Sequence, residues 1–159
     1  MKYIAAALIA ATAQAGAASY ASKVCVSNMA GFVLHWWMDD LITGNSSSDS
    51  GSYPIDQTRC MDIAGTLNAV QLGDFIEVYV HAALGETKTC NSAIIYQASP
   101  AVTASFTCTG TTLNFGCSLN GQAYLQELEA AGMYEELYAF AAEHNLEYTP
   151  AVAPEVVQE

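Results

Sequence analysis

Short segments with apolar side chains at every second position recur along this chain, and turn residues separate them. The clearest span Gly31–Met38 and Asp74–Ala83. One face of each is apolar, with Phe32, Leu34, Trp36 and Met38 in the first and Ile76, Val78, Val80 and Ala82 in the second. A period of two is that of a half-buried β-strand. Six or seven short strands between 22 and 118 predict a mainly β fold, an antiparallel β-sandwich, with a small closed barrel as the alternative.

The clearest local signal is a hairpin formed by Val102–Cys108 and Thr111–Cys117. Thr109-Gly110 between them is typical of a two-residue turn. In this register Phe106 faces Leu113, Ala104 faces Phe115 and Val102 faces Cys117. All six side chains then lie on one buried face, which supports the register.

The spacing of apolar residues becomes helical after Gly121, and Gly132 divides the segment into two short helices. We therefore divide the chain into a β-sandwich domain (19–120), an acidic helical segment (121–149) and a tail (150–159). The tail has two prolines and little to bury, so we expect it to be disordered.

Residues 1–18 have the features of a secretory signal peptide: Lys2, an apolar stretch, and small residues up to Ala18. No later apolar run approaches the length of a membrane span. We expect a protein that is secreted or lumenal in the secretory pathway, with no transmembrane segment after cleavage.

The charge of the chain excludes one class of partner. Four basic residues oppose sixteen acidic ones, a formal net charge of −12. Such a surface repels phosphate, so we predict no nucleic-acid binding, and anionic lipid is disfavoured. Residues 121–159 hold eight Glu and no Lys or Arg, which suits a basic partner.

Five cysteines in a secreted domain predict disulfides and one unpaired thiol. The hairpin register separates Cys108 from Cys117 by roughly 20 Å, which disfavours that pair. We predict Cys90–Cys108, with Cys25–Cys60 as the second bridge. The remaining thiol is either buried and inert or bonded to a partner chain. No Cys-x-x-Cys pair occurs, so zinc and redox sites are not expected.

The second faces of the two clearest strands carry a candidate ligand-binding site, comprising His35, Trp37, Glu77, Tyr79 and His81. If the strands are neighbours, these side chains form one aromatic, polar patch. Such a patch suits a sugar, because rings stack on its C–H face and polar groups bond its hydroxyls. The alternative, which we favour at this point, is that the C-terminal helices cover this face, since their apolar stripe must be buried somewhere.

The loop after the first strand holds two weaker candidates. Asp39, Asp40 and Asp49 offer hard oxygen ligands for Ca²⁺, but their spacing matches no EF-hand loop, which favours a solvated acidic loop and no metal site. Asn45-Ser46-Ser47 is an N-glycosylation acceptor sequence, relevant in a eukaryotic source.

The helical segment is a second candidate surface for a partner. Its residues Tyr134, Leu137, Tyr138 and Phe140 would dock into a groove of another protein. The alternative is a helical cap on the β domain, with the Glu side chains in water.

Sequence motifs give no support to an enzyme. No Gly-x-Ser-x-Gly, His-Glu-x-x-His or Gly-rich phosphate loop is present, and we expect no cofactor. We predict a secreted, non-enzymatic interaction or accessory protein that binds an extracellular or lumenal protein. A carbohydrate-binding, lectin-like module is the alternative, and a small secreted hydrolase is the third.

Overall fold

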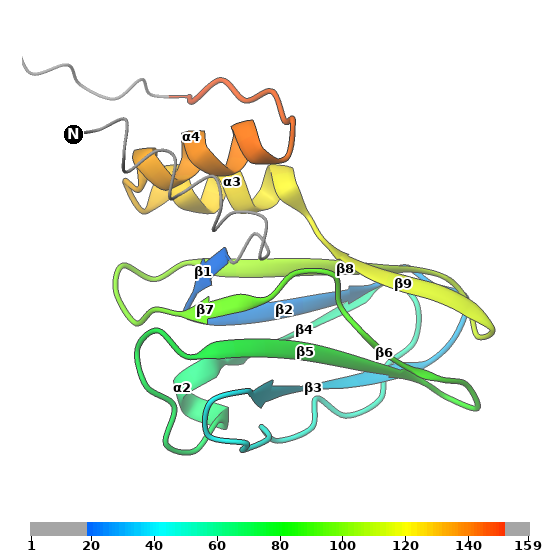
Figure 1. Ribbon diagram of the computed structural model, residues 1–159. Helices are drawn as coiled ribbons and strands as arrows, with labels where there is room; N and C mark the ends of the chain where they lie inside the picture. Colours follow the sequence, from blue (N-terminus) through cyan, green and yellow to red (C-terminus); the bar gives the residue numbers. More distant parts are fainter. Residues whose placement is uncertain (1–18, 152–159) are drawn as a thin grey trace, which may run out of the picture.

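The computed structural model describes residues 19–151, and within them the chain forms nine strands and three helices (Figure 1). The predicted signal peptide and all but the first two residues of the predicted tail lie outside the described residues. The elements in chain order are β1 (Ser19–Ala21), β2 (Lys23–Asn28), β3 (Leu34–Asp40), β4 (Gln57–Asp62), α2 (Ile63–Thr66), β5 (Phe75–Ala82), β6 (Thr87–Thr89), β7 (Ile94–Tyr96), β8 (Thr103–Thr111), β9 (Asn114–Leu119), α3 (Gly121–Ala130) and α4 (Tyr134–Glu143).

The strands form two mixed sheets. Sheet A has the order β1-β7-β5-β3, with β6 also paired to β5, and sheet B has the order β4-β2-β8-β9. The pairs β1–β7 and β2–β8 are parallel and the others antiparallel, so the prediction of a strictly antiparallel fold is wrong. The two parallel pairs arise because only Ser22 separates β1 from β2, so the chain continues in one direction from sheet A into sheet B. The neighbours of these two strands, β7 and β8, run in that same direction.

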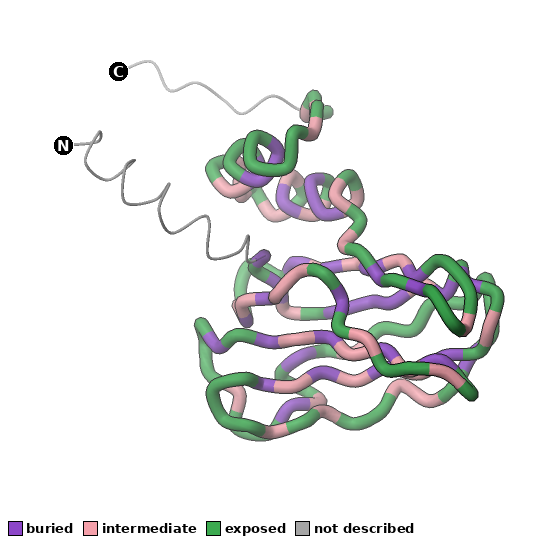
Figure 2. Tube along the Cα trace, turned by 45° about the vertical axis from the view of Figure 1, so that its right-hand side comes forward, coloured by how far each residue is buried: buried purple, intermediate pink, exposed green. Residues whose placement is uncertain are grey.

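The inward side chains of both sheets form one buried core. The apolar faces predicted for β3 and β5 are confirmed, and from Leu34 to Met38 and from Ile76 to Ala82 every second side chain is fully buried. Figure 2 shows this alternation of buried and partly exposed residues along the strands. Each such aliphatic or aromatic side chain contributes about 1.5–3 kcal/mol by leaving water.

The β8–β9 hairpin differs from the predicted register. Thr111 pairs with Asn114, so Thr112-Leu113 is the connection, and Leu113 is 83% exposed instead of buried. Gly110 lies within β8 with φ 116°, and a Cβ there would stand 2.4 Å from the Asn114 carbonyl oxygen. This glycine therefore permits a close backbone approach and does not form the turn.

The corrected register decides one disulfide. Cys108 lies directly opposite Cys117, with Cα atoms 4.0 Å apart, and the two are bonded. The predicted bridge from Cys90 to Cys108 is therefore wrong, while Cys25–Cys60, which joins β2 and β4, is confirmed. Cys90 is a buried thiol, and burial raises its pKa. The two disulfides indicate an oxidising environment.

Helices α3 and α4 lie beside β1 and β8, on the side of the molecule away from β3 (Figure 1). Their apolar side chains pack mainly on each other and on Val102, in a cluster separate from the main core. The Tyr124 hydroxyl donates to the Tyr20 carbonyl oxygen at 2.7 Å, and Thr103 N donates to Glu127 at 3.0 Å. The expectation that these helices cover the outer face of β3 and β5 is wrong, because the two-helix pair buries its own apolar stripe.

Candidate ligand-binding face

The antiparallel pairing of β3 and β5 brings the predicted ligand-binding residues together on the outer side of sheet A. His35 lies opposite His81, Trp37 lies opposite Tyr79, and Glu77 is next along β5. All five side chains are half-buried, and their neighbours along each strand point into the core. We call this set of five residues the aromatic face.

The rings of the aromatic face are in contact with one another. Trp37 and Tyr79 are nearly parallel, with an interplanar angle of 11° and centroids 5.8 Å apart. His35 stacks on Trp37 at 5.8 Å and lies 5.2 Å from His81. These contacts, two across the strands and one along β3, hold each ring in a defined orientation without burying it.

Polar groups at the edges of the rings are held by hydrogen bonds. The Tyr79 hydroxyl donates to Glu77 at 2.8 Å, and this bond, ahead of burial, raises the pKa of Tyr79 to about 12. His35 Nδ1 lies 2.6 Å from an Asp49 carboxylate oxygen, and His81 Nδ1 lies 2.8 Å from the Thr87 hydroxyl. The Nδ1 atoms are thus occupied, so contact with a ligand falls to the two Nε2 atoms.

Sequence reasoning missed Asp49 and Thr87 as parts of this face. Asp49 comes from the Ser-rich loop after β3, and no periodicity indicates that this loop returns along the strand. Thr87 belongs to β6, whose three residues are too few to show alternation.

The three aspartates considered for calcium do not converge. Asp39 faces outward and accepts from the Ser46 hydroxyl at 2.6 Å, and Asp49 is bonded to His35. Asp40 points inward and is fully buried, so the expectation of a wholly solvated acidic loop is wrong for this residue. Within residues 19–151, no group of three or more His, Cys, Asp or Glu side chains is arranged to hold a metal ion.

Asn45, the predicted glycosylation site, is half-buried in this loop. Its side-chain amide nitrogen, the atom to which a glycan would be attached, donates to the Asn68 carbonyl oxygen at 2.9 Å. Glycosylation stays a prediction.

The predicted partner-binding residues of the helical segment divide between core and surface. Leu137 and Phe140 are buried in the helix pair, whereas Tyr138 is 46% exposed, with its ring centroid 6.5 Å from that of Tyr134. The four side chains therefore do not share one open face.

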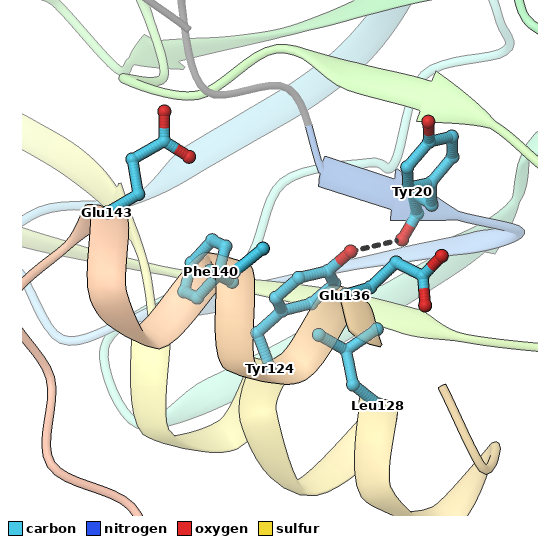
Figure 3. A pocket seen from close by; sticks show the side chains of 7 residues that line it. Tyr20, Tyr124, Leu128, Glu136, Phe140 and Glu143 are labelled. Atoms are coloured by element: carbon cyan, nitrogen blue, oxygen red, sulfur yellow. Dashed lines mark hydrogen bonds between the residues drawn. The ribbon is translucent and has the colours of Figure 1, made fainter. Parts of the chain in front are cut away.

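A small hollow of about 110 Å³ lies where α4 meets β1 (Figure 3). Tyr124, Leu128 and Phe140 form its apolar wall, and Glu136 and Glu143 carry charge at its margin. Its volume is small compared with ligand sites of several hundred Å³.

A Ser-His-Asp type of arrangement would require one histidine that is hydrogen-bonded both to a nucleophile and to a carboxylate. Among the described residues, His35 is hydrogen-bonded to the Asp49 carboxylate but to no hydroxyl or thiol, and His81 is hydrogen-bonded to the Thr87 hydroxyl but to no carboxylate. In the same part of the chain, no helix combines the length and the apolar character needed to cross a membrane.

Comparison with known proteins gives little further information. No protein-family model matches the chain, and no curated protein does. Among solved structures, the chain is similar to pneumolysin, with a TM-score of 0.37 and 12% identity over 62% of this chain and 23% of that chain. For listeriolysin O the values are 0.36, 19%, 62% and 22%. The chain spans less than a quarter of either protein, and likenesses this low carry no argument about fold family or function.

Proposed function

We propose that this protein is a secreted, non-enzymatic binding protein whose aromatic face binds a carbohydrate. One observation supports this most: Trp37 and Tyr79 stand parallel and half-exposed on an open sheet face, beside the carboxylate of Glu77. Aromatic rings next to fixed polar groups match the alternating C–H and hydroxyl surfaces of a sugar.

The charges around the face favour a neutral or amino sugar. Glu77, Asp39 and Asp49 lie on it or at its border, and none of the described Lys or Arg side chains forms an ion pair there. Acidic sugars such as uronic acids would be repelled by these carboxylates.

A glycan array followed by titration of the strongest ligand tests this proposal. We expect Trp37→Ala to weaken binding by tenfold or more, which corresponds to about 1.4 kcal/mol. Thr107→Ala is the matched control, because Thr107 is a half-buried outward residue in the middle of a strand of the other sheet. An array without any bound neutral or amino sugar would contradict the proposal, as would an equal loss of affinity in both variants.

A protein partner bound through the helical segment is the second candidate. It is supported by the paired rings of Tyr134 and Tyr138 on α4, next to Glu135 and Glu136. An acidic surface with two tyrosines suits a basic partner. Size-exclusion chromatography of gently extracted protein, with mass spectrometry of co-eluting chains, tests it. Elution as a complex that Tyr138→Ala dissolves supports this function, and elution as a free monomer opposes it.

A further inference from the structure

A row of outward apolar side chains crosses sheet A next to the aromatic face. Phe75 is the next outward residue of β5 after Tyr79 and Glu77. Phe75 pairs with Ile95 of β7, and Ile95 pairs with Tyr20 of β1, which lie side by side in Figure 1. Each of the three has a buried neighbour on both sides along the chain, so each points away from the core. We call Phe75, Ile95 and Tyr20 the apolar row.

A hollow of about 320 Å³ opens beside the apolar row. Tyr20 and Ile95 contribute to its lining from the strands, and Leu72 contributes from the turn before β5. Its volume is at the lower end of the range of ligand sites, about 300–1,000 Å³. None of the described residues that line it carries a charge, although the chain has a formal net charge of −12. The hollow therefore suits an uncharged, apolar group.

Leu72 stands at the hollow in a turn that backbone hydrogen bonds hold in place. Gly73 N donates to the Tyr96 carbonyl oxygen at 2.9 Å, and Tyr96 N donates to the Asp74 carbonyl oxygen at 3.0 Å. These bonds fix the turn beside the end of β7. Leu72 is nevertheless 71% exposed, so its side chain contributes little to the burial of apolar surface in the fold. Its apolar surface is thus held in position and accessible to a ligand.

We propose that the carbohydrate ligand is an amphipathic glycoside, and that its non-sugar part, an alkyl chain, occupies this hollow. The inference rests on the proposed function, since the sugar part would lie on the aromatic face. The two sites are continuous: from Tyr79 to Phe75 the outward side of β5 extends over four residues, about 13 Å. An alkyl chain needs no hydrogen-bond partner and gains by leaving water, which matches an uncharged lining of leucine, isoleucine and tyrosine.

Calorimetric titration with two glycosides of the sugar that the glycan array selects tests this inference. One is the methyl glycoside and the other is the decyl glycoside, used below the concentration at which it forms micelles. Each CH₂ group that leaves water strengthens binding about fourfold. We therefore expect the decyl glycoside to bind about tenfold or more tightly than the methyl glycoside, because burial of two CH₂ groups already suffices.

Three variants locate the alkyl chain. Leu72→Ser should lose most of the gain that the decyl chain gives, while its affinity for the methyl glycoside stays unchanged. Ile95→Thr should do the same, and threonine suits an outward strand position. Leu84→Ser is the matched control, because Leu84 is fully exposed in the turn beyond the other end of β5. This variant should keep the whole gain.

The possible failures are distinguishable. Equal affinities of the wild-type protein for the two glycosides would overturn this inference and leave the proposed function standing. An array without a bound neutral or amino sugar contradicts the proposed function and this inference with it. A gain that survives both Leu72→Ser and Ile95→Thr, or that Leu84→Ser reduces equally, would place the alkyl chain elsewhere and also overturn the inference.

Analytical ultracentrifugation of the protein without ligand tests the other occupant, a second copy of the chain. We expect the same sedimentation for the wild-type protein and Leu72→Ser. A dimer that Leu72→Ser dissociates, together with equal affinities for the two glycosides, would make the hollow a contact between copies and overturn the inference.

Discussion

The outer faces of the two sheets have similar exposure but different chemistry. On sheet B, the outward residues of the central strands are mostly small and hydroxyl-bearing: Ser27, Thr103, Ser105 and Thr107. Ser27 and Thr58 bond across β2 and β4 through their hydroxyl groups at 2.7 Å. On sheet A, the same type of position in β3 and β5 carries the rings and imidazoles of the aromatic face.

This difference indicates that the outer face of sheet B contributes to the stability of the fold, whereas the aromatic face of sheet A is suited to binding a ligand. Threonine and serine on an open strand suit the pleated backbone and leave little apolar surface in water. Half-exposed rings leave ring surface in water that the fold does not bury, and a bound ligand would use it. The comparison predicts that changes on the aromatic face reduce binding, while changes in the core or in the cross-links of sheet B reduce stability.

The largest expected effect separates two adjacent tryptophans. Trp36 is fully buried in the core, so Trp36→Ala should lower the free energy of unfolding by about 3–5 kcal/mol. Trp37 points outward, so Trp37→Ala should lower the free energy of unfolding by about 1 kcal/mol or less, while weakening glycan binding by tenfold or more. Urea denaturation followed by far-UV circular dichroism measures both. A loss of stability in Trp37→Ala equal to that in Trp36→Ala would show that the aromatic face is structural, and the comparison would fail.

Removing the disulfide on the outer face of sheet B should have the next largest effect. Cys25 and Cys60 join neighbouring strands across a sequence separation of 35 residues. On the chain-entropy estimate, closing a loop of this length contributes about 4 kcal/mol to stability. We expect Cys25→Ala/Cys60→Ala to lower the free energy of unfolding by about 3–4 kcal/mol.

The same double variant should bind the glycan with unchanged affinity at a temperature where it is folded, because the aromatic face belongs to the other sheet. The measurement is urea denaturation together with calorimetric titration of the ligand. A folded double variant that no longer binds would show that the two sheets are not independent in this respect.

The strands of the candidate site were predictable from sequence, because alternation alone determines which side chains share a face. It separated Trp36 from Trp37 and placed Tyr79 with His81. The hairpin register was not predictable by the same argument. The predicted and observed registers differ by six residues, an even number, so both place Phe106 and Cys117 on the buried side. Alternation cannot distinguish such registers. Gly110 was assigned to the turn because a turn favours glycine, but a close backbone approach within a strand favours glycine as well.

The position of the helices was not predictable for a different reason. An apolar helical stripe shows that something must cover it, but not what. Here Leu125 and Leu128 of α3 pack with Leu137 and Phe140 of α4, so the pair needs only the margin of the β domain around Val102. The aromatic face was left open by this self-contained packing, which no local pattern in the sequence reports.

The smallest expected effect concerns the proton of Tyr79. Its hydrogen bond to Glu77, followed by burial and the charges of Glu77 and Asp39, raises its pKa from 10.0 to about 12. The folded state therefore holds this proton more tightly than the unfolded state. The resulting contribution to stability is fully present below pH 10 and is lost as the pH rises from 10 towards 12. Glu77→Gln removes the charge, so the pKa of Tyr79 should fall towards 10 and this part of the alkaline loss of stability should shrink.

Carbon-13 NMR of labelled tyrosine resolves the titration of individual phenols and measures this change. Tyr148 is the internal control, because its hydrogen bond to Glu129 raises its pKa to about 12 in the helical segment, outside the main core. In Glu77→Gln only Tyr79 should shift. A Tyr79 that titrates near 12 in both proteins would mean that burial, not the carboxylate, determines its pKa. Tyr79 would then be a packed ring of sheet A, and the contrast between an open binding face and a structural face would weaken at its central residue.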